Sequence, residues 1–405
     1  MSCHGRRRAR APIPFPNESF GPGPRKGLAA LLVGLGCACG PRGEPGYSGE
    51  AFPSRRTELP IGSANLGFVA NSGSDTVSVV DLDNFTLVSE LPVGRNPVDR
   101  DGPRSLVIDR SRALVHIILS FPDTESGPHS VDFGSERPGY VQTLALEDLR
   151  PLHETRVGSA PFAMALTPSE LNLVVVHNDP ARALIGEDAL SRRSTVTVLD
   201  ARFGEGQSAE LVELPLCITP RAFEFASDGS LVAACVGDDA LVELDLSSGE
   251  LSTAFDVDPS APQKPYAMSR SPDGQRLAVA YQLSRQIVLF DVEALDGANR
   301  SLPVSGVPSS TTWLSDEVLL VSICDPDGVV LIDTQDLSII QKYNFGAECD
   351  APSELALGPS GGLYLVCEGD GFQRGTLVQL DAQTLAAEKS LELGVAPDRM
   401  AVITR

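Results

Sequence analysis

The sequence predicts an all-β protein: a seven-bladed β-propeller of four-stranded blades, whose ring is closed by pairing the C-terminal strand with the N-terminal blade. The first of three observations behind this prediction is a repeated phrase, in which an apolar strand ends in aspartate, a second strand follows, and a proline comes next. The aspartates are Asp81, Asp148, Asp200, Asp245, Asp291, Asp333 and Asp381, and the prolines are Pro103, Pro161, Pro220, Pro265, Pro308, Pro352 and Pro397. The later prolines recur about every 45 residues and the earlier ones at nearly 60, a period typical of propellers and solenoids.

The second observation is the content of each repeat. Between Pro220 and Pro265 the chain reads RAFEFAS, LVAACVGD, ALVELD and STAFDVD, and the next repeat reads YAMSRS, RLAVAYQ, QIVLFD and SLPVSG. These are four short strand-like runs separated by turns. No helical period extends over any length, so propeller blades fit the repeat better than the helices of an α-solenoid.

The third observation concerns the two ends of the repeat region. Residues 398–405 follow the last proline like an innermost strand with no blade after it, whereas the first unit, residues 66–93, holds three strands and lacks the inner one. Joining the two completes a seventh blade. We therefore expect hydrogen bonds, rather than a covalent link, to seal the ring and remove the exposed sheet edges.

The first unit also resembles the repeat of the YVTN-type bacterial β-propeller family. The resemblance lies in Phe68-Val69-Ala70-Asn71, in Thr76-Val77-Ser78-Val79-Val80-Asp81 and in Leu91-Pro92-Val93-Gly94, and in looser form it covers residues 61–405. It implies a seven-bladed propeller on the outer side of the cytoplasmic membrane. This family includes cell-surface and periplasmic binding proteins, and related seven-bladed folds include sugar lactonases and quinone-linked or copper enzymes.

The N-terminal segment reads as a secretion signal. Arg25-Lys26 precede about ten apolar or small residues, 27–36, and Cys37 follows, as in the signal of a bacterial lipoprotein. We therefore predict a leader at 1–36, a flexible tether rich in Gly, Pro, Ser and Arg at 37–60, and the propeller at 61–405. Cys37 is the expected site of lipidation, and Cys39 or a signal that is cleaved without lipidation are the alternatives.

The charge of the chain restricts its partners. The formal net charge is −22, and because residues 1–36 carry +5, the rest of the chain carries −27. Such a surface repels nucleic acid and anionic membranes, so we expect no nucleic-acid partner and membrane contact only through a lipid anchor. An unidentified protein or small-molecule ligand is the partner class that fits, and we expect a monomer.

Four cysteines occupy matching positions in two repeats. Cys217 and Cys235 are 18 residues apart, as are Cys349 and Cys367, and in each pair the first lies three residues before the repeat proline. Equivalent repeat positions imply equivalent places in the fold, so we expect two disulfides, each tying an incoming loop to the end of a second strand. Such bonds need an oxidising compartment; buried reduced thiols are the alternative.

No catalytic motif, cofactor or metal site is predicted. Aligning the second strands by their Leu-Val cores places seven residues at one level: Asn71, Ile118, His177, Cys235, Tyr281, Cys324 and Cys367. Thiolate and imidazole suit copper or zinc, but two of the cysteines have disulfide partners, this strand does not line the channel, and no ligand pair has metal-site spacing. Cys324 is the one cysteine of residues 61–405 that this scheme leaves without a predicted partner.

A ligand, if bound, is expected at the mouth of the channel, where the loops that enter each innermost strand gather. The positions after the repeat prolines supply Arg104, Phe162, Arg221, Tyr266, Asp398 and Arg399, beside Ser309 and Ser353. Two or three arginines with an aromatic ring can hold an anion or a carboxylate in an otherwise acidic protein. The alternative is that they cap strands and pair with nearby acids such as Asp99, Asp101 and Glu224.

Irregularities in the repeat give a second indication of function. Residues 120–138 and 178–194 are insertions at the same place in adjacent blades, and 96–102 form a longer entry loop beside them. Insertions on one face often form a binding surface. We favour a noncatalytic, lipid-anchored binding or interaction scaffold of the cell envelope. The competing hypothesis is a periplasmic enzyme of lactonase-like or quinone-linked type with its site at the channel mouth.

Overall fold

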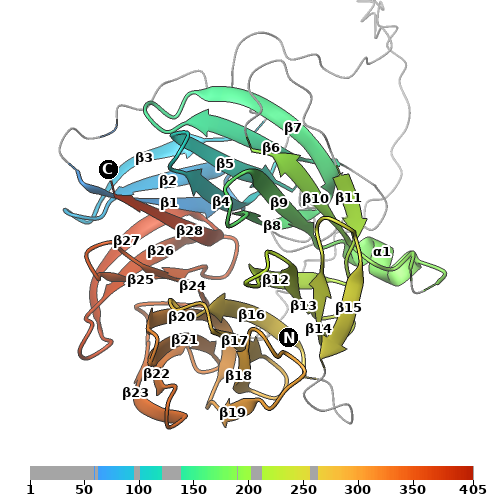
Figure 1. Ribbon diagram of the computed structural model, residues 1–405. Coiled ribbons are helices and arrows are strands. Elements are labelled where there is room, and N and C mark those ends of the chain that lie inside the picture. The colour runs from blue at the N-terminus through green and yellow to red at the C-terminus, as the bar shows by residue number, and fades with distance from the viewer. Residues whose placement is uncertain are drawn as a thin grey trace, which may run out of the picture.

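The protein is a ring of seven blades. The computed structural model describes residue 59 and residues 63–94, 101–120, 138–188, 190–201, 212–255 and 263–404. In these ranges, strands β1 to β28 form seven four-stranded antiparallel sheets around a central axis (Figure 1). The predicted fold, a seven-bladed β-propeller of four-stranded blades, is confirmed.

Blades 1 to 6 run in chain order from the innermost strand to the outermost. Blade 1 holds β4 (Pro103–Asp109), β5 (Leu114–Leu119), β6 (Pro138–Ala145) and β7 (Pro151–Ser159). Blade 2 holds β8 (Pro161–Leu166), β9 (Asn172–His177), β10 (Thr195–Asp200) and β11 (Val212–Pro215). Blade 3 holds β12 (Pro220–Phe225), β13 (Leu231–Cys235), β14 (Ala240–Leu244) and β15 (Leu251–Phe255).

The next three blades follow the same order. Blade 4 holds β16 (Pro265–Arg270), β17 (Arg276–Tyr281), β18 (Gln286–Asp291) and β19 (Arg300–Pro303). Blade 5 holds β20 (Val307–Ser315), β21 (Val318–Cys324), β22 (Gly328–Asp333) and β23 (Ser338–Asn344). Blade 6 holds β24 (Pro352–Leu357), β25 (Leu363–Cys367), β26 (Arg374–Leu380) and β27 (Ala387–Val395).

Blade 7 is built from both ends of the chain, as predicted. Its innermost strand is β28 (Pro397–Thr404), and β1 (Asn65–Asn71), β2 (Thr76–Asp81) and β3 (Thr86–Pro92) complete the sheet. β28 pairs with β1 in antiparallel register, from Asn65 opposite Thr404 to Asn71 opposite Pro397. Backbone hydrogen bonds therefore close the ring.

The hydrophobic core lies between the blades. Seven clusters of buried side chains are found in the described residues, one at each junction of neighbouring blades. In the cluster between blades 7 and 1, for example, Leu66 and Phe68 of β1 pack with Ile117 of β5. Second strands such as β13 and β25 are buried along their whole length because both faces meet a neighbouring sheet.

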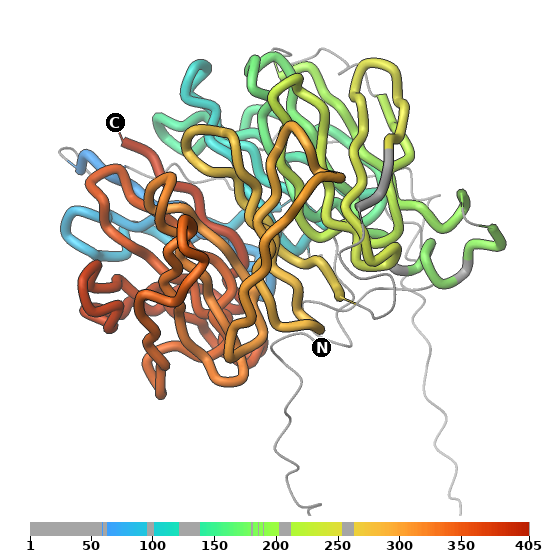
Figure 2. The backbone as a smooth tube through the Cα atoms, turned by 60° about the horizontal axis from the view of Figure 1, so that its bottom comes forward, coloured from blue at the N-terminus to red at the C-terminus, as the bar shows by residue number. Residues whose placement is uncertain are grey.

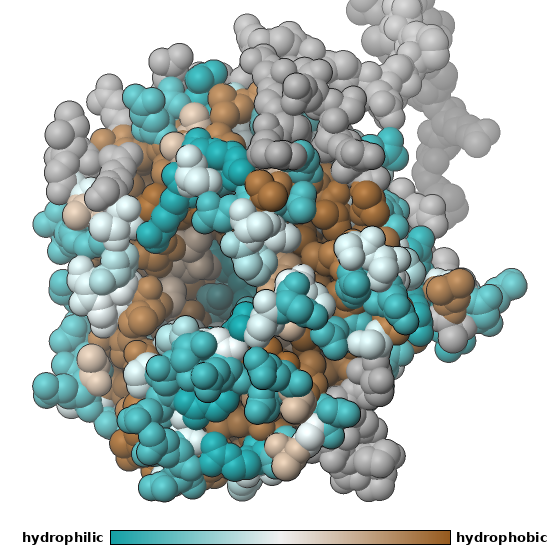
Figure 3. Space-filling model, in the orientation of Figure 1, coloured by the Kyte–Doolittle hydropathy of each residue, from teal (hydrophilic) through white to brown (hydrophobic). Residues whose placement is uncertain are grey.

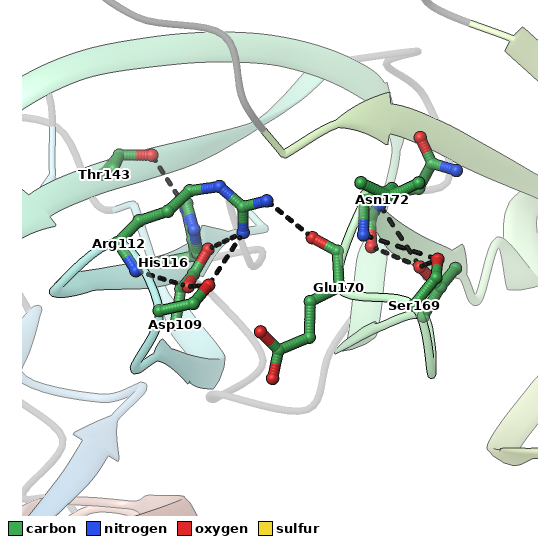
Figure 4. A network of polar contacts seen from close by, with 10 residues as sticks. Asp109, Arg112, His116, Thr143, Ser169, Glu170 and Asn172 are labelled. Atoms are coloured by element: carbon green, nitrogen blue, oxygen red, sulfur yellow. Dashed lines mark hydrogen bonds and ion pairs between the residues drawn. The ribbon is translucent and has the colours of Figure 1, made fainter.

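Polar contacts also join the blades, as between blades 1 and 2 (Figure 4). Arg112, in the turn between β4 and β5, donates to the carboxylate of Asp109 at 2.6 Å and to the backbone carbonyl of Glu170 in the next blade at 2.8 Å. Beside them, His116 Nδ1 lies 3.0 Å from Thr143 Oγ1. The histidine is 3% exposed, so this contact belongs to the interior of the blade.

The aspartate of the repeated phrase shapes the turn after the third strand of each blade. In six of the seven, its carboxylate accepts the backbone N–H two residues later, and the residues are Asp81, Asp148, Asp245, Asp291, Asp333 and Asp381. For Asp200, the loop that follows lies outside the described residues. These bonds form Asx-turns, which explains why the repeat uses aspartate at this position. At Asp245, hydrogen bonds from the side chain and then the backbone of Ser247 lower the pKa to about 2.

The proline of the phrase marks the entry to the channel. In six blades a residue with positive φ precedes it: Gly102, Ala160, Thr219, Lys264, Ala351 and Ala396. The carbonyl of each accepts the N–H of the residue that follows the second strand, respectively Ser120, Asn178, Val236, Gln282, Glu368 and Ser72. The entry loop and the end of the second strand are thus bonded together at the same end of the blade, which defines one mouth of the channel.

A β-bulge follows the proline in every blade. The register between the first and second strands shifts by one residue after Pro103, Pro161, Pro220, Pro265, Pro308, Pro352 and Pro397. A bulge leaves one residue without a partner in the ladder and re-aims its side chain. The register corrects the predicted level of two second-strand residues, because Leu119 and Ile323, not Ile118 and Cys324, lie opposite Pro103 and Pro308.

The two predicted disulfides are confirmed. Cys217 and Cys235 are joined with their Cα atoms 6.0 Å apart, and Cys349 and Cys367 with theirs 5.3 Å apart. Each bond ties the loop before a repeat proline to the end of a second strand. Disulfides of this kind indicate an oxidising compartment outside the cytoplasm. Cys324 is buried and is disulfide-bonded as well.

Replacing both Cys217 and Cys235 by alanine is expected to lower the free energy of unfolding by about 3 kcal/mol, because a bond across 18 residues restricts the unfolded chain. The midpoint of urea-induced unfolding, followed by circular dichroism, measures this loss. Reductant should lower the midpoint of the wild type further, since it also opens Cys349–Cys367. An unchanged midpoint in the variant would contradict the prediction.

Several predicted segments lie outside the described residues. These are the leader, nearly all of the tether with its Cys37 and Cys39, and most of the loops 96–102 and 120–138. The insertion at 178–194 is described apart from residue 189. No helix in the described part of the chain is long and apolar enough to cross a membrane.

Candidate functional site

The centre of the ring is hollowed, and hydrophilic residues are visible at the base of the hollow (Figure 3). The seven innermost strands surround it (Figure 1), and the residue after each repeat proline lies at the mouth end of its strand. The structure brings the predicted residues Arg104, Phe162, Arg221, Tyr266 and Asp398 together there.

Arg221 of β12 lies between two aromatic rings. The carbon of its guanidinium group is 4.5 Å from the centre of the Phe162 ring, on blade 2, and 4.4 Å from the centre of the Tyr266 ring, on blade 4. One guanidinium nitrogen also donates to the Tyr266 hydroxyl. Cation–π contacts of this kind contribute about 0.5–2 kcal/mol each and hold the planar group in one orientation.

Arg221 has no carboxylate partner among the described residues. Its Nε atom is buried and forms no hydrogen bond. A buried N–H group normally has a hydrogen-bond acceptor, because removing it from water without replacement is unfavourable. Arg221 is thus held between two rings without a carboxylate opposite it among the described residues.

Arg104 stands beside this pair and links it to Asp398. Its guanidinium carbon lies 5.8 Å from the centre of the Phe162 ring, and its Nη1 is 3.9 Å from a carboxylate oxygen of Asp398. Burial, followed by the neighbouring charge of Arg221, lowers the pKa of Arg104, while Asp398 and Glu368 act in the opposite direction. These groups influence one another because they meet at one mouth.

Arg399 behaves differently from the other arginines. Its Nη1 donates to the Glu354 carboxylate of the neighbouring blade at 2.6 Å, which raises the pKa of Arg399. Burial raises the pKa of Glu354. At Arg399 the alternative prediction, pairing with a nearby acid, holds, although Glu354 was not among the predicted acids. Arg104 likewise has an acid nearby, Asp398.

The remaining post-proline residues are small. Ser309 donates to the Pro352 carbonyl at 2.8 Å, and Ser353 donates to the Val366 carbonyl at 3.2 Å. Both hydroxyls are thus used within the scaffold. The mouth is lopsided, with long side chains from blades 1 to 4 and short ones from blades 5 and 6.

One further carboxylate lies on an innermost strand. Glu224 is three residues after Arg221 on β12, and burial raises its pKa to about 7, opposed by a hydrogen bond from the backbone N–H of Arg270. A carboxyl group with a pKa near neutrality can act as a general base or acid. The hydrogen bond from the backbone N–H of Arg270 gives Glu224 an alternative, structural role, because its carboxylate then satisfies a backbone group of the neighbouring strand β16.

Sequence reasoning missed Glu354 and Glu368 as residues of the mouth. Glu354 occupies the second position after its proline, where the only other charged residue is Arg399, on the adjacent blade. Opposite charges at the same position of neighbouring repeats could therefore have predicted the Glu354–Arg399 pair. Glu368 directly follows Cys367 at the end of β25 and is 7% exposed.

The residues of the metal hypothesis are otherwise engaged. His177 lies 2.9 Å from the Ser159 carbonyl through Nδ1 and 2.7 Å from the Thr197 hydroxyl through Nε2. In the described residues, one cluster has metal-ligand distances, and it consists of Cys217, Cys235 and Asp238. Its two sulfur atoms are joined in the disulfide, so they are not thiolate ligands.

The insertion at 178–194 forms a projecting arm on the side of the ring (Figure 2). It contains the helix α1 (Pro180–Ile185), whose first turn is capped by the Asp179 side chain. Leu184 and Leu190 are 69% and 65% exposed on this arm. The arm leaves blade 2 between its second and third strands, at the end of the blade that carries Phe162.

No family model and no curated protein matches the sequence. Solved structures do match. A periplasmic gluconolactonase from Pseudomonas aeruginosa is 15% identical, with a TM-score of 0.60 over 84% of this chain and 99% of that chain. The dihydro-heme d1 dehydrogenase NirN is 17% identical, with a TM-score of 0.56 over 89% and 82%. A streptogramin B lyase is 13% identical, with a TM-score of 0.53 over 77% and 93%.

At these identities the likeness concerns the fold. The three proteins carry different activities on one architecture, as is common for widespread folds. The resemblance to the YVTN repeat stays a prediction, since no family model supports it.

Proposed function

We propose that this protein is an extracytoplasmic propeller, anchored by lipid at Cys37, that binds a small carboxylate-bearing molecule at the channel mouth without transforming it. The observation that carries the proposal is Arg221, a fixed guanidinium with no carboxylate partner among the described residues. A planar guanidinium matches a carboxylate through two parallel hydrogen bonds. The two disulfides support the extracytoplasmic location. Detergent phase partition tests the anchor, because the wild type should enter the detergent phase and Cys37→Ala should not.

Arg221→Met is expected to weaken carboxylate binding about 10- to 100-fold, because it removes a charge-assisted contact and keeps most of the side-chain volume. Isothermal titration with acetate, succinate, citrate and gluconate measures the effect. Arg285→Met is the matched control. Arg285 lies on blade 4, at the mouth end of the ring, but it is 47% exposed and pairs with Asp325 at 3.5 Å. Equal affinity of wild type and Arg221→Met for every carboxylate would refute the proposal.

Lactone hydrolysis is a second candidate. The solved structures favour it over the noncatalytic role, since one of these similar propellers is a periplasmic gluconolactonase. In this protein the favourable observation is Glu224, whose carboxyl group has a pKa of about 7 on the strand that carries Arg221. Such a group can take a proton from the attacking water, and the hydroxy-acid product would present its carboxylate to Arg221.

A pH-stat assay with glucono-δ-lactone separates the two candidates. A hydrolase would exceed the spontaneous rate, and Glu224→Gln would abolish the excess while leaving gluconate binding unchanged. A rate equal to that of buffer alone would eliminate the enzymatic candidate for this lactone and leave the binding proposal in place.

A further inference from the structure

The residues in the middle of the innermost strands line the channel. Each innermost strand is paired along one edge with a second strand and meets a neighbouring blade on both faces, so a side chain there is exposed only toward the channel. Three positions after the repeat proline, the side chain is buried in six of the seven blades, whereas four positions after it the side chain is partly exposed in all seven. The fourth position therefore marks the channel wall.

On four consecutive blades this wall is aliphatic. Blades 6, 7, 1 and 2 follow one another around the ring, and their innermost strands are in contact. At the fourth position after the proline they carry Ala356, Ala401, Val107 and Ala165, respectively. One side of the channel is thus covered by apolar side chains at this depth, and hydrophobic surface is visible on the wall of the hollow (Figure 3).

The apolar surface continues toward the far end of the channel, the end opposite the mouth. The fifth position on the same four blades holds Leu357, Val402, Ile108 and Leu166. None of these side chains is buried, and Leu357 is 41% exposed. We call the fourth and fifth positions of these blades the aliphatic wall. Contiguous apolar surface left in contact with water is unfavourable and often marks a place where a ligand binds.

The opposite side of the channel is polar and already satisfied. At the fourth position, blades 3, 4 and 5 carry Glu224, Ser269 and Thr312. Glu224 accepts a backbone N–H of blade 4, Ser269 donates to a hydroxyl of blade 5 at 2.8 Å, and Thr312 donates to a backbone carbonyl of blade 6 at 3.0 Å. These groups bond within the scaffold, so the surface that gains most from a ligand is the aliphatic wall.

The aliphatic wall begins on the strand that supports the cation of the mouth. Phe162, whose ring centre lies 4.5 Å from the guanidinium carbon of Arg221, stands on β8 three residues before Ala165 and four before Leu166. A strand advances about 3.3 Å per residue, so the mouth and the deeper level of the wall are about 13 Å apart, the reach of an extended chain of about ten carbons. A single molecule can therefore contact both.

We propose that the channel binds an amphiphilic monocarboxylate, with its carboxylate at Arg221 and its hydrocarbon chain along the aliphatic wall. This inference rests on the proposed function, since the carboxylate end is the ligand already assigned to Arg221. It adds the chemical class of the rest of the molecule, an alkyl chain of about six to ten carbons. Hydroxyl groups on that chain would lose water at the aliphatic wall without gaining a partner there.

A homologous series of carboxylates tests the proposal. Acetate, butyrate, hexanoate, octanoate and decanoate are titrated calorimetrically at pH 7, each below the concentration at which it forms micelles. A fully buried methylene raises affinity about fourfold, and a chain that lies against one wall should gain about half of that free energy. Octanoate should therefore bind at least about tenfold tighter than butyrate. Gluconate, the polyhydroxylated counterpart of hexanoate, should bind more weakly than hexanoate.

Two substitutions in the wall have matched controls. Ala165→Asn places an uncharged amide in the path of the chain and should remove most of the gain that chain length gives, whereas Ser269→Asn makes the same change at the same level of the polar side and should keep the gain. Leu357→Asn should weaken decanoate several-fold. Its control is Leu171→Asn, because Leu171 is 46% exposed at the same end of the ring but lies in the turn between β8 and β9.

The melting temperature of each variant establishes that it folds before it is titrated. The proposal is overturned if chain length adds no affinity, or if the full gain survives in both Ala165→Asn and Leu357→Asn. If Arg221→Met weakens acetate while chain length adds nothing, only the amphiphile is refuted and the carboxylate site stands. If Arg221→Met changes no affinity, the carboxylate site itself is refuted.

Discussion

Deleting residues 397–405 is expected to abolish the cooperative folding of the whole ring. The deletion removes the strand that pairs with β1 and exposes Leu66 and Phe68, which are 0% and 1% exposed in the intact protein. It also removes the buried Met400 and Ile403. Four such side chains account for about 6–12 kcal/mol of burial, which is comparable to the net stability of a typical domain. Calorimetry should show no cooperative transition, and gel filtration should show aggregates formed through the open sheet edge.

A circular permutant provides the control. Joining residue 404 to residue 63 by a short linker and opening the chain at the exposed residues 296–298, between β18 and β19, keeps every strand pair. The permutant should melt within a few degrees of the wild type, because the two joined ends lie side by side in blade 7. A truncated protein that stays monomeric with an unchanged melting temperature would show that β28 does not close the ring.

Acid is expected to destabilise the protein between about pH 6.5 and pH 4 through two buried histidines. Burial lowers the pKa values of His116 and His177 from 6.5 to about 4. In this range the unfolded chain binds a proton on each histidine and the folded protein does not, so stability falls as the pH falls. Each histidine can cost up to about 3 kcal/mol. His177 illustrates the cause. Its Nε2 lies next to the Thr197 hydroxyl, and a protonated Nε2 could no longer accept a hydrogen bond from that hydroxyl.

Glu224 opposes the histidines in the same range. Burial raises its pKa from 4.5 to about 7, so the folded protein binds a proton there that the unfolded chain has released, and stability from this group falls as the pH rises. Between pH 4.5 and 6.5, unfolding takes up about two protons at the histidines and releases about one at Glu224. This net uptake of about one proton changes the free energy of unfolding by about 1.4 kcal/mol per pH unit. Glu354 and Asp327, whose pKa values burial also raises, reduce this slope.

The slopes of variants are therefore more informative than that of the wild type. His177→Gln should reduce the slope of unfolding free energy against pH by about 1.4 kcal/mol per pH unit, the equivalent of one proton. Glu224→Gln should increase the slope by the same amount. Urea unfolding at half-unit intervals from pH 4.5 to 7 measures all three proteins. If both variants keep the wild-type slope, these two groups do not titrate as the structure implies.

The fold was predictable from the sequence because its repeat encodes local geometry. The aspartate at or after the end of the third strand makes an Asx-turn in six blades, and the proline stands at the entry to an innermost strand, so counting them counted the blades. Cysteines at equal repeat positions were paired correctly for the same reason. Register was less accessible: the alignment placed Ile118 and Cys324 one residue away from their level, since the second strands differ in length, from five residues in β13 to seven in β21, and their apolar cores alone do not fix the register.

The candidate site was predictable in position but not in its pairing. The post-proline rule placed Arg104, Phe162, Arg221 and Tyr266 at one mouth, where the structure has them. It could not show that Arg399 is engaged by Glu354 while Arg221 is not engaged by any described acid, because those contacts cross between blades. Contacts between repeats depend on side-chain direction, which the period of the repeat does not specify.

The bulge after each repeat proline separates the duties of neighbouring residues. The proline and the residue before it hold the frame, whereas the bulged residue contributes no pair to the ladder. In blades 2, 3 and 4 the bulged residues are Phe162, Arg221 and Tyr266, and their side chains meet at the mouth, with Arg221 between the other two. These three positions therefore carry substituents on a constant framework, and a library that varies only residues 162, 221 and 266 should yield propellers of similar stability and different ligand preference.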